Sequence, residues 1–420
     1  MSLTPTRRSA LLCMAGAAAL LVAFPALAAD VTVTFWGSYG NGGNSTQQDA
    51  LHNTLIPAFE SAYPGIKIKY VDVPYDSLLQ KLTTSAAGGE LPDLVRADLG
   101  WVPQFAELGV LVPLSDAMPD FQALADATYP GVLATNSYQG KYYGLPLDTN
   151  TRVLVTSKEA LNAAGLSAPP ATFDELKAMG EKLKGSDVAV FADGGLGGWN
   201  IFPWLWSGGG SITNPELTRA TGYLDSPENV ATVQMLVDLY QAGQIPNLII
   251  GNQGAVSTSD GLPSMNYATI LDGPWMAGIW AEQYPDFTPV YAPVPAGAGG
   301  SISVVGGEDI VLTASSQNQE AALEFIRFTQ SEQFQVEMAR TGQMTVIPAY
   351  AAQQAEIAPF YATFAEQLKT ARSRLAIAQG SKVDGILNAE LVPAFEGKAS
   401  VQEALTSAAG QIDALLAGGK

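Results

Sequence analysis

The chain has 420 residues, of which 47% are hydrophobic and 15% are charged. This is the composition of a globular protein, and a chain of this length is expected to fold as two or more domains. Its 21 Lys and Arg against 40 Asp and Glu give a formal net charge of −19. Nucleic acid and anionic membrane surfaces are therefore not expected as partners, because both bind basic surfaces.

The first 28 residues have the pattern of a removable export signal. Arg7 and Arg8 precede an apolar run over 10–24, which is too short to span a bilayer, and a small-x-small cleavage pattern follows at 26–28. A permanent anchor helix is the alternative, and Pro25 argues against it because it interrupts the apolar run. We expect residues 1–28 to be a signal peptide and the protein to be periplasmic or otherwise extracytoplasmic. The pattern leaves open whether export uses the Sec or the twin-arginine route.

Cysteine and histidine are each present once. Cys13 lies inside the expected signal, and His52 lies in a predicted helix with no nucleophile-elbow pattern around it. Disulfides, cysteine-based metal sites and multi-histidine metal sites are excluded for the mature chain. We therefore expect no metal, no other cofactor and no catalytic residues, and we interpret His52 as an ordinary residue of a helix surface.

After the expected signal, strand and helix patterns alternate along the chain. Alternating apolar residues predict strands over 31–35 and 66–73, a short buried run predicts a strand at 94–95, and helical periodicity predicts helices over 47–63, 75–87, 101–108, 363–378 and 400–417. This order predicts an α/β fold with a helical C-terminal region, and it places ligand-binding loops at the carboxyl ends of strands.

Several segments, taken together in their order and spacing, resemble the solute-binding proteins of ABC importers. They are 33–37 (VTFWG), 59–68 (FESAYPGIKI), 79–94 (LQKLTTSAAGGELPDL), 140–148 (GKYYGLPLD), 272–275 (DGPW) and 320–326 (EAALEFI). The resemblance is to the large carbohydrate-binding family that includes the maltose-binding proteins, and it covers nearly all of the chain after the signal.

The resemblance implies a two-lobed, type II-like periplasmic-binding-protein fold, with a hinge that the chain crosses more than once. Carried onto this sequence, lobe one takes in residues 30–148 plus 308–345, and lobe two takes in residues 149–307 plus 346–420. A small-molecule carbohydrate ligand, an ABC transporter permease as partner and a monomeric state are implied in the same way.

Tryptophans next to glycine or proline are candidates for contact with the flat face of a sugar ring. Trp199 and Trp204 lie in the glycine-rich segment 193–210, and Trp36 and Trp275 lie at turns that match the cleft of the family. The alternative is that these rings belong to the core of a lobe. For Trp36 and Trp275 we favour contact with the ligand.

Polar candidates follow the predicted strands. Tyr39, Asn41 and Asn44 follow the first strand, and Asp98 and Trp101 follow the third. Their amide, phenol and carboxyl groups are suited to sugar hydroxyls, and the family uses an acid near the position of Asp98. Turn formation at Asn41 and capping of the next helix by Asp98 are the alternatives.

A second group of candidates lies at the expected hinge. Asp148, Asn150 and Arg152 follow the Leu-Pro pair at 145–146, and the acid and the arginine either bond the ligand or pair with each other. Asp272 either contacts the ligand or positions the Gly-Pro-Trp turn. Glu308 follows two glycines, where the chain returns to lobe one.

These observations predict a binding protein that captures a sugar or oligosaccharide and delivers it to an ABC transporter permease. A secreted glycosidase is the first alternative, and none of the 40 acids stands in a recognisable catalytic pair. The second alternative is the same fold binding another solute: a glycerol phosphate, a polyamine or a metal ion. Phosphate requires clustered basic residues, which are scarce here, whereas a polyamine suits the acids.

Overall fold

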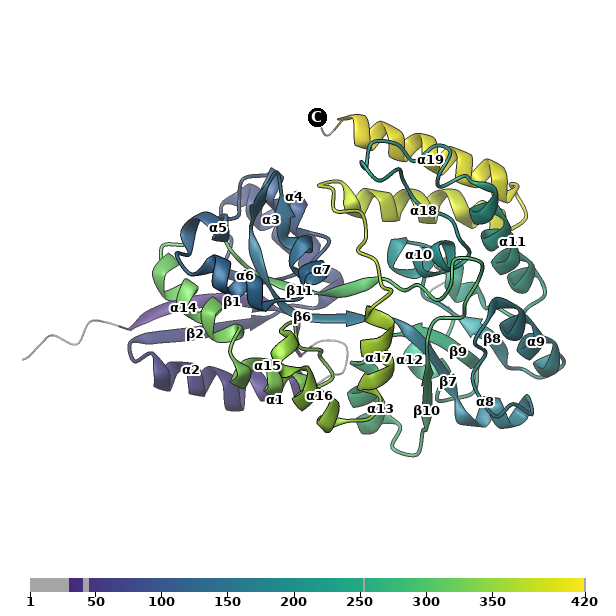
Figure 1. The fold of residues 1–420 in the computed structure, drawn as a ribbon, viewed down its shortest axis with the longest axis horizontal. Helices are drawn as coiled ribbons and strands as arrows, with labels where there is room; N and C mark the ends of the chain where they lie inside the picture. Colours follow the sequence, from purple (N-terminus) through teal and green to yellow (C-terminus); the bar gives the residue numbers. More distant parts are fainter. Residues whose placement is uncertain (1–29, 41–44, 252–253, 419–420) are drawn as a thin grey trace, which may run out of the picture.

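The computed structural model describes residues 30–40, 45–251 and 254–418. These residues form two α/β lobes side by side, each built around its own sheet (Figure 1). The expected signal peptide at 1–28 lies outside the described residues. Within the described ranges, no helix has an apolar stretch long enough to cross a bilayer.

The sheet of lobe one has the order β2-β1-β3-β11-β6. Its strands are β1 (Val31–Gly37), β2 (Ile66–Asp72), β3 (Leu94–Asp98), β6 (Gly144–Thr151) and β11 (Val305–Leu312). β1 pairs in parallel with β2 and β3, whereas β11 runs antiparallel to its neighbours β3 and β6. The carboxyl ends of β1 and β3 therefore point the same way, which brings the loops that follow them to one edge of the sheet.

The sheet of lobe two has the order β10-β7-β9-β8. Its strands are β7 (Val153–Ser157), β8 (Ala189–Ala192), β9 (Tyr267–Asp272) and β10 (Pro289–Ala292). A separate two-stranded hairpin in lobe one consists of β4 (Ser137–Tyr138) and β5 (Lys141–Tyr142). The strand predictions for 31–35, 66–73 and 94–95 are confirmed, because period-two alternation and short buried runs report burial directly.

The two sheets are joined at the hinge by the crossing from β6 to β7 and by the return of the chain to β11. β6 of lobe one is separated from β7 of lobe two by Arg152 alone, and the chain returns at β11. The boundaries expected at 148 and 308 fall inside β6 and β11, since both strands extend beyond them to Thr151 and Val305. At the hinge, the end of β6 and the start of β11 are therefore paired with each other.

Helices cover both sheets. In lobe one they are α1 (Ser45–Ala50), a π-helical turn (Leu51–Leu55), α2 (Ile56–Ala62), α3 (Tyr75–Gly88), α4 (Val102–Glu107), α5 (Leu114–Ala117), α6 (Phe121–Ala127), α7 (Pro130–Leu133), α14 (Gln319–Thr329) and α15 (Glu332–Ala339). The predicted helix 47–63 is confirmed as the unbroken helical run α1, π turn and α2. His52 is exposed on its surface, as predicted.

Lobe two carries the remaining helices. They are α8 (Lys158–Ala163), α9 (Phe173–Leu183), α10 (Gly198–Ser207), α11 (Pro227–Gln241), α12 (Thr258–Gly261), α13 (Met276–Gln283), α17 (Tyr361–Leu368), α18 (Gly380–Phe395) and α19 (Val401–Gly418), with α16 (Ala351–Ile357) on the connection from lobe one. Leucines of α18 and α19, such as Leu387 and Leu405, are fully buried in the lobe-two core with Leu236 of α11. The helical C-terminal region is therefore an integral part of lobe two.

The predicted helix 363–378 is wrong over its second half. α17 ends at Leu368, and residues 369–379 form an irregular segment that we call the strap. The backbone of Arg372 in the strap pairs with the returning chain: its N–H donates to the Ser303 carbonyl, and the Val305 N–H donates to its carbonyl, both at 2.9 Å. These bonds replace helical bonds, which a pattern of Ala, Leu and Gln does not reveal.

Candidate functional site

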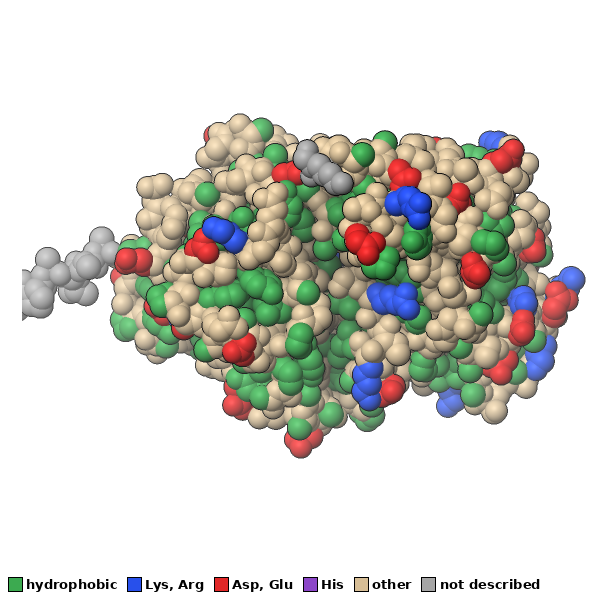
Figure 2. Space-filling view, turned by 45° about the horizontal axis from the view of Figure 1, so that its top comes forward, with side chains coloured by type: hydrophobic (Ala, Val, Ile, Leu, Met, Phe, Trp, Pro, Cys, Tyr) green, Lys and Arg blue, Asp and Glu red, His purple; other side chains and the backbone are tan. Residues whose placement is uncertain are grey.

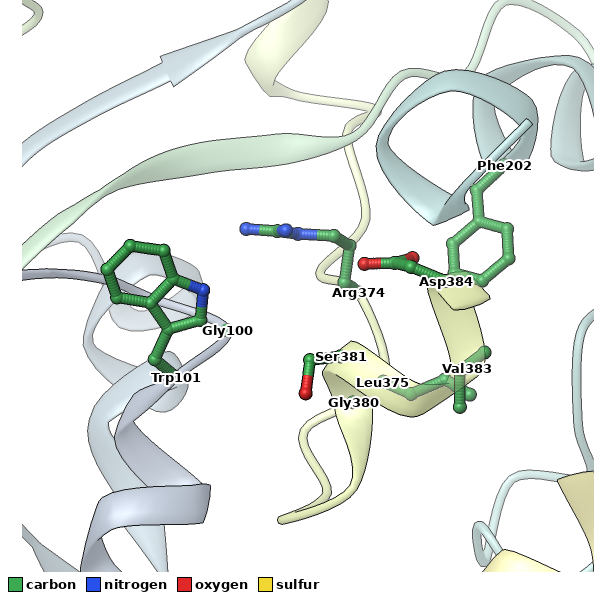
Figure 3. Close-up of a pocket in the computed structure, with 9 residues that line it drawn as sticks. All are labelled: Gly100, Trp101, Phe202, Arg374, Leu375, Gly380, Ser381, Val383 and Asp384. Atoms are coloured by element: carbon green, nitrogen blue, oxygen red, sulfur yellow. The ribbon is translucent and has the colours of Figure 1, made fainter. Parts of the chain in front are cut away.

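A small cavity lies where the two lobes meet (Figure 3). Gly100 and Trp101 line it from lobe one, and Phe202, Arg374, Leu375, Gly380, Ser381, Val383 and Asp384 line it from lobe two. Its volume of about 40 Å³ is enough for a few water molecules only. The lobes are therefore in close contact here, and Figure 2 shows the seam between them as a groove with hydrophobic side chains along it.

Asp98 stands beside this cavity at the end of β3, and its carboxylate receives three donors. The Tyr75 hydroxyl donates to Oδ2 at 2.6 Å, while the Gly100 N–H and Arg374 Nη2 donate to Oδ1 at 2.7 and 2.5 Å. Only the Gly100 bond is local. Trp101 is the residue at the N-terminal end of α4, and no side-chain hydrogen bond caps the helix there. Asp98 therefore joins the two lobes and does not act as the helix cap that was the alternative.

Aromatic rings flank this carboxylate on both sides. In lobe one, the rings of Tyr75 and Trp101 lie 5.6 Å apart, and Tyr75 remains 40% exposed although its hydroxyl is bonded to Asp98. In lobe two, Trp199 lies 6.2 Å from Trp275, with the guanidinium of Arg374 at 5.7 Å from the Trp199 ring. We call these six residues (Tyr75, Asp98, Trp101, Trp199, Trp275 and Arg374) the interlobe cluster.

Gly306 in β11 makes room for the lobe-two rings. A Cβ on Gly306 would lie 2.6 Å from the Trp199 ring and 2.2 Å from Asn150 Oδ1, so only glycine permits both side chains at these positions. The Oδ1 atom of Asn150 is buried and has no hydrogen-bond partner. The hinge strands β6 and β11 are therefore closely packed here, and the Asn150 Oδ1 atom is a hydrogen-bond acceptor without a partner.

Arg152, at the crossing from β6 to β7, is fixed by lobe two. It donates to Asp193 at 2.9 Å, to the Trp199 carbonyl at 3.0 Å and to the Leu271 carbonyl, and its guanidinium lies 5.5 Å from the Trp199 ring. Both members of the ion pair have side chains only 4% exposed. Arg152 thus pairs with Asp193 and not with Asp148, which was one of the sequence expectations.

Asp272 ends β9 beside this pair. Its carboxylate accepts from the Gly273 N–H at 2.8 Å, so it does position the Gly-Pro-Trp turn. Burial raises the pKa of Asp272 to about 6, against the opposing charge of Arg152. The Asp272 carboxyl therefore changes its protonation state in mildly acidic solution.

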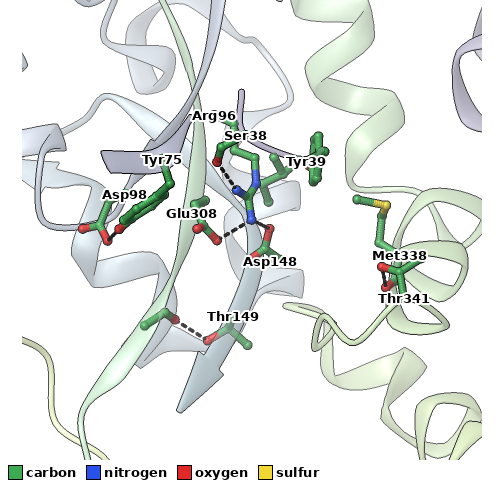
Figure 4. Close-up of polar contacts among 12 residues, drawn as sticks. Ser38, Tyr39, Tyr75, Arg96, Asp98, Asp148, Thr149, Glu308, Met338 and Thr341 are labelled. Atoms are coloured by element: carbon green, nitrogen blue, oxygen red, sulfur yellow. Dashed lines mark hydrogen bonds and ion pairs between the residues drawn. The ribbon is translucent and has the colours of Figure 1, made fainter. Parts of the chain in front are cut away.

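A second buried polar group lies in lobe one, to one side of Tyr75 and Asp98 in Figure 4. Arg96 of β3 donates to Ser38 at 3.0 Å and pairs with Asp148 at 3.3 Å and Glu308 at 2.8 Å, and its guanidinium lies 4.5 Å from the Tyr39 ring. Burial raises the pKa of Glu308 well above its ordinary value; Arg96 opposes this shift and Asp148 adds to it. These charges compensate one another inside the lobe.

Three arginines near the interface, Arg96, Arg152 and Arg374, are each paired with acids. Arg96 pairs with Asp148 and Glu308, while Arg152 and Arg374 pair with one acid each. No group of three or more His, Cys, Asp or Glu in the described ranges is arranged to hold a metal ion. The arrangement therefore offers hydrogen bonds and ring faces to a ligand, while these three arginines are already paired.

The structure separates the predicted residues into those it brings together and those it does not. Trp204 is 1% exposed and packs between Phe173 and Phe191 in the lobe-two core, so its ring is not available at the interface, which corrects the expectation for this residue. Trp36 packs in the same lobe-one cluster as Trp101, beneath the ammonium of Lys81 at 4.2 Å. Tyr39 is fully buried, and its hydroxyl has no partner.

Asn41 and Asn44 lie outside the described residues. Sequence reasoning missed Tyr75, Arg374 and Asp193 as members of the site. Tyr75 follows Pro74 directly after a strand, which is the same signal that identified Asp98, whereas Arg374 was hidden in the predicted helix.

The comparisons with known proteins agree with this architecture. A binding protein of Brucella abortus is 29% identical over 388 residues, covering 86% of this chain and 88% of the relative. Among solved structures, the cyclic α-maltosyl-1,6-maltose binding protein of Arthrobacter globiformis is 27% identical, with a TM-score of 0.76 and coverage of 93% of this chain and 100% of the other. An ABC transporter solute-binding protein of Thermotoga lettingae, bound with α-D-tagatose, is 25% identical, with a TM-score of 0.81 and coverage of 92% and 99%.

The family model of the bacterial extracellular solute-binding proteins matches residues 42–336, which is more than half of the chain. This span includes β3, the hinge strands and most of the interlobe cluster. The two-lobed fold predicted from the resemblance is confirmed by the structural neighbours. The chain belongs to the bacterial extracellular solute-binding protein family.

Proposed function

We propose that this protein captures a sugar or oligosaccharide between its lobes and delivers it, chemically unchanged, to the permease of an ABC transporter. In this proposal the protein is monomeric and works outside the cytoplasm after removal of residues 1–28. The ligands of the two solved relatives, tagatose and a cyclic maltosyl-maltose, support a carbohydrate cargo.

The observation that carries the proposal is the composition of the interlobe cluster. Rings from both lobes flank a carboxylate and a guanidinium that are already paired with each other. Apolar ring faces match the C–H faces of a pyranose, and paired donors and acceptors match its hydroxyl groups. Because the arginines are compensated, a neutral ligand costs less to desolvate here than a phosphate.

The family and the site both favour a binding protein over a glycosidase. Hydrolysis requires two carboxyls on either side of the scissile bond, one of them free to donate a proton. Asp98, beside the cavity, and Glu308, its cross-strand neighbour in β11, are engaged with Arg374 and Arg96. A polyamine remains the second cargo to test, because buried acids line both lobes.

A thermal-shift panel tests the proposal. The purified protein is heated with mono- to tetrasaccharides, polyols, spermidine and glycerol 3-phosphate, each over a range of concentrations. A ligand of the native state raises Tm by mass action, so a saccharide is expected to raise it and the phosphate is not. A shift with spermidine alone contradicts the carbohydrate proposal.

Incubation with the saccharide that binds, followed by chromatography of the sugar, separates binding from hydrolysis. The expected result is recovery of intact ligand. Steady release of shorter sugars would favour the glycosidase.

A further inference from the structure

The strap between α17 and α18 carries one arginine into the interface between the lobes. Arg374 leaves the lobe-two side and its guanidinium reaches Asp98 of β3, as seen in Figure 3, where it extends toward Trp101. Among the ion pairs of the described residues, Asp98–Arg374 is the one that joins the two lobes. The other interlobe side-chain bonds nearby, Gln104–Ser381 at 3.3 Å and Glu107–Gln379 at 3.4 Å, are long.

Arg374 has a second carboxylate within its own lobe. Asp384 of α18 lines the same cavity, and its carboxylate accepts from the Gly198 N–H at 2.6 Å. Burial raises the pKa of Asp384, and the positive charge of Arg374 opposes that shift, so the two groups interact electrostatically. Arg374 thus lies between an acid of lobe one and an acid of lobe two.

The guanidinium is incompletely satisfied where it stands. Its Nε atom is buried and has no hydrogen-bond partner, while Nη2 is bonded to Asp98. A buried donor without a partner is costly, and an alternative arrangement or a ligand oxygen would satisfy it. The Arg374 side chain, with one acid on each side and an unsatisfied Nε, is therefore suited to two discrete positions.

We propose that Arg374 is a positioning residue that sets the closure of the two lobes by exchanging partners, with Asp98 in the closed arrangement and Asp384 when the lobes separate. The pair with Asp98 holds the lobes together before the ligand arrives and presents spare guanidinium donors to it. Pairing with Asp384 compensates the guanidinium when Asp98 moves away, and the carboxylate of Asp98 keeps two donors of its own lobe, the Tyr75 hydroxyl and the Gly100 N–H. The effect on ligand affinity rests on the proposed function, whereas the effect on lobe distance does not.

Removal of either acid has opposite consequences under this proposal. Asp98→Asn weakens the closed arrangement, and Asp384→Asn weakens the open one, while the asparagine oxygen still accepts from the Gly198 N–H. A merely structural role for these residues would not reverse the direction of the change between the two variants.

The distance between lobes is measured by pulsed electron paramagnetic resonance on the ligand-free protein. Cys13 is the chain's only cysteine, so Cys13→Ser permits labels at two introduced cysteines, Gln80→Cys in α3 and Ser407→Cys in α19, both at exposed positions. These helices lie on opposite lobes (Figure 1).

Arg374→Met and Asp98→Asn are expected to shift the distance distribution toward longer values, and Asp384→Asn toward shorter ones. Arg374→Lys keeps the charge and is expected to retain part of the short-distance population. The matched control is Arg372→Met on the same strap, whose guanidinium faces Trp206 at 5.8 Å and which is expected to leave the distribution unchanged. Circular dichroism melts verify that each variant is folded.

The affinity for a saccharide that binds in the panel gives the second measurement. Because apparent affinity scales with the binding-competent fraction, Arg374→Met is expected to weaken it by about tenfold and Asp384→Asn to strengthen it severalfold. An unchanged distance distribution in Arg374→Met, or shifts of the same sign in Asp98→Asn and Asp384→Asn, overturns the proposal. Tighter binding by Arg374→Met also overturns it, since it would make Arg374 a competitor of the ligand. Failure of every sugar to bind wild type would count against the proposed function alone.

Discussion

The rings of Trp199 and Trp275 lie with their centroids 6.2 Å apart and their planes inclined at 30°, one from the start of α10 and the other from the turn after β9. The segment of lobe one that follows α15 passes close to the backbone of Trp275: a Cβ on Gly342 would lie 2.9 Å from the Cα of Trp275. A Cβ on Gly306 of β11 would lie 2.6 Å from the Trp199 ring. Both tryptophans therefore lie close to segments of lobe one.

Trp275→Ala is expected to weaken saccharide binding by about thirtyfold, which corresponds to about 2 kcal/mol, a loss typical of a tryptophan at a binding hot spot. Its effect on the free energy of unfolding should be smaller. Titration calorimetry and urea denaturation measure the two quantities. Trp204→Ala is the opposite case, because it empties a core position and should cost about 3–5 kcal/mol of stability. Equal losses of binding and stability in Trp275→Ala would assign it to the core.

Gly306→Ala is expected to displace the Trp199 ring, because the added Cβ has no space beside it or beside Asn150. Overpacking of this kind costs about 1–3 kcal/mol. Tryptophan emission and urea denaturation of the ligand-free protein detect the change. Gly194→Ala is the control, since a Cβ there meets no atom within 4 Å; a spectrum and stability equal to wild type in both variants would contradict the packing argument.

Arg152→Met should be strongly destabilising, because it leaves Asp193 buried with an uncompensated charge. The expected loss is about 3–5 kcal/mol in the free energy of unfolding. Adding Asp193→Asn to this variant removes the charge and should restore a substantial part of the stability. A double variant no more stable than the single one would show that charge compensation is not the role of the pair.

The pH dependence of stability should contain a contribution from Asp272. Its pKa is raised in the folded protein to about 6, so the native state binds a proton more tightly than the unfolded chain does. This contribution to stability is therefore full at low pH and is lost as the pH rises through about 6.

Asp272→Asn keeps an acceptor for the Gly273 N–H and removes the charge. Relative to wild type it should gain more in Tm at pH 7.5 than at pH 4.5. Asp187→Asn, at an exposed position, serves as the control. A difference between the two proteins that is the same at both pH values would contradict the assignment.

The sequence was informative wherever the signal is local. The first strands and the helix 47–63 were predicted because periodicity reports which face of an element is buried. Asp98 and Trp101 were identified because they follow a strand that ends at the ligand edge of the sheet. The same rule applied to Pro74 and Tyr75 would have added Tyr75.

What only the tertiary structure decided is which charges and rings meet. Asp98 and Arg374 are 276 residues apart in sequence, and the helix predicted over 363–378 ends at Leu368 because the strap pairs with the returning hinge strand. Trp204 and Trp199 share one glycine-rich segment, yet one is core and the other interface, since side chains five residues apart on α10 point in directions about 140° apart. Periodicity and composition by themselves predicted alternating strands and helices, more than one domain and an excess of acidic residues; the arrangement in two lobes was implied by the family resemblance. The partner of each buried group depends on which distant segments the fold brings together, and local sequence patterns do not contain that information.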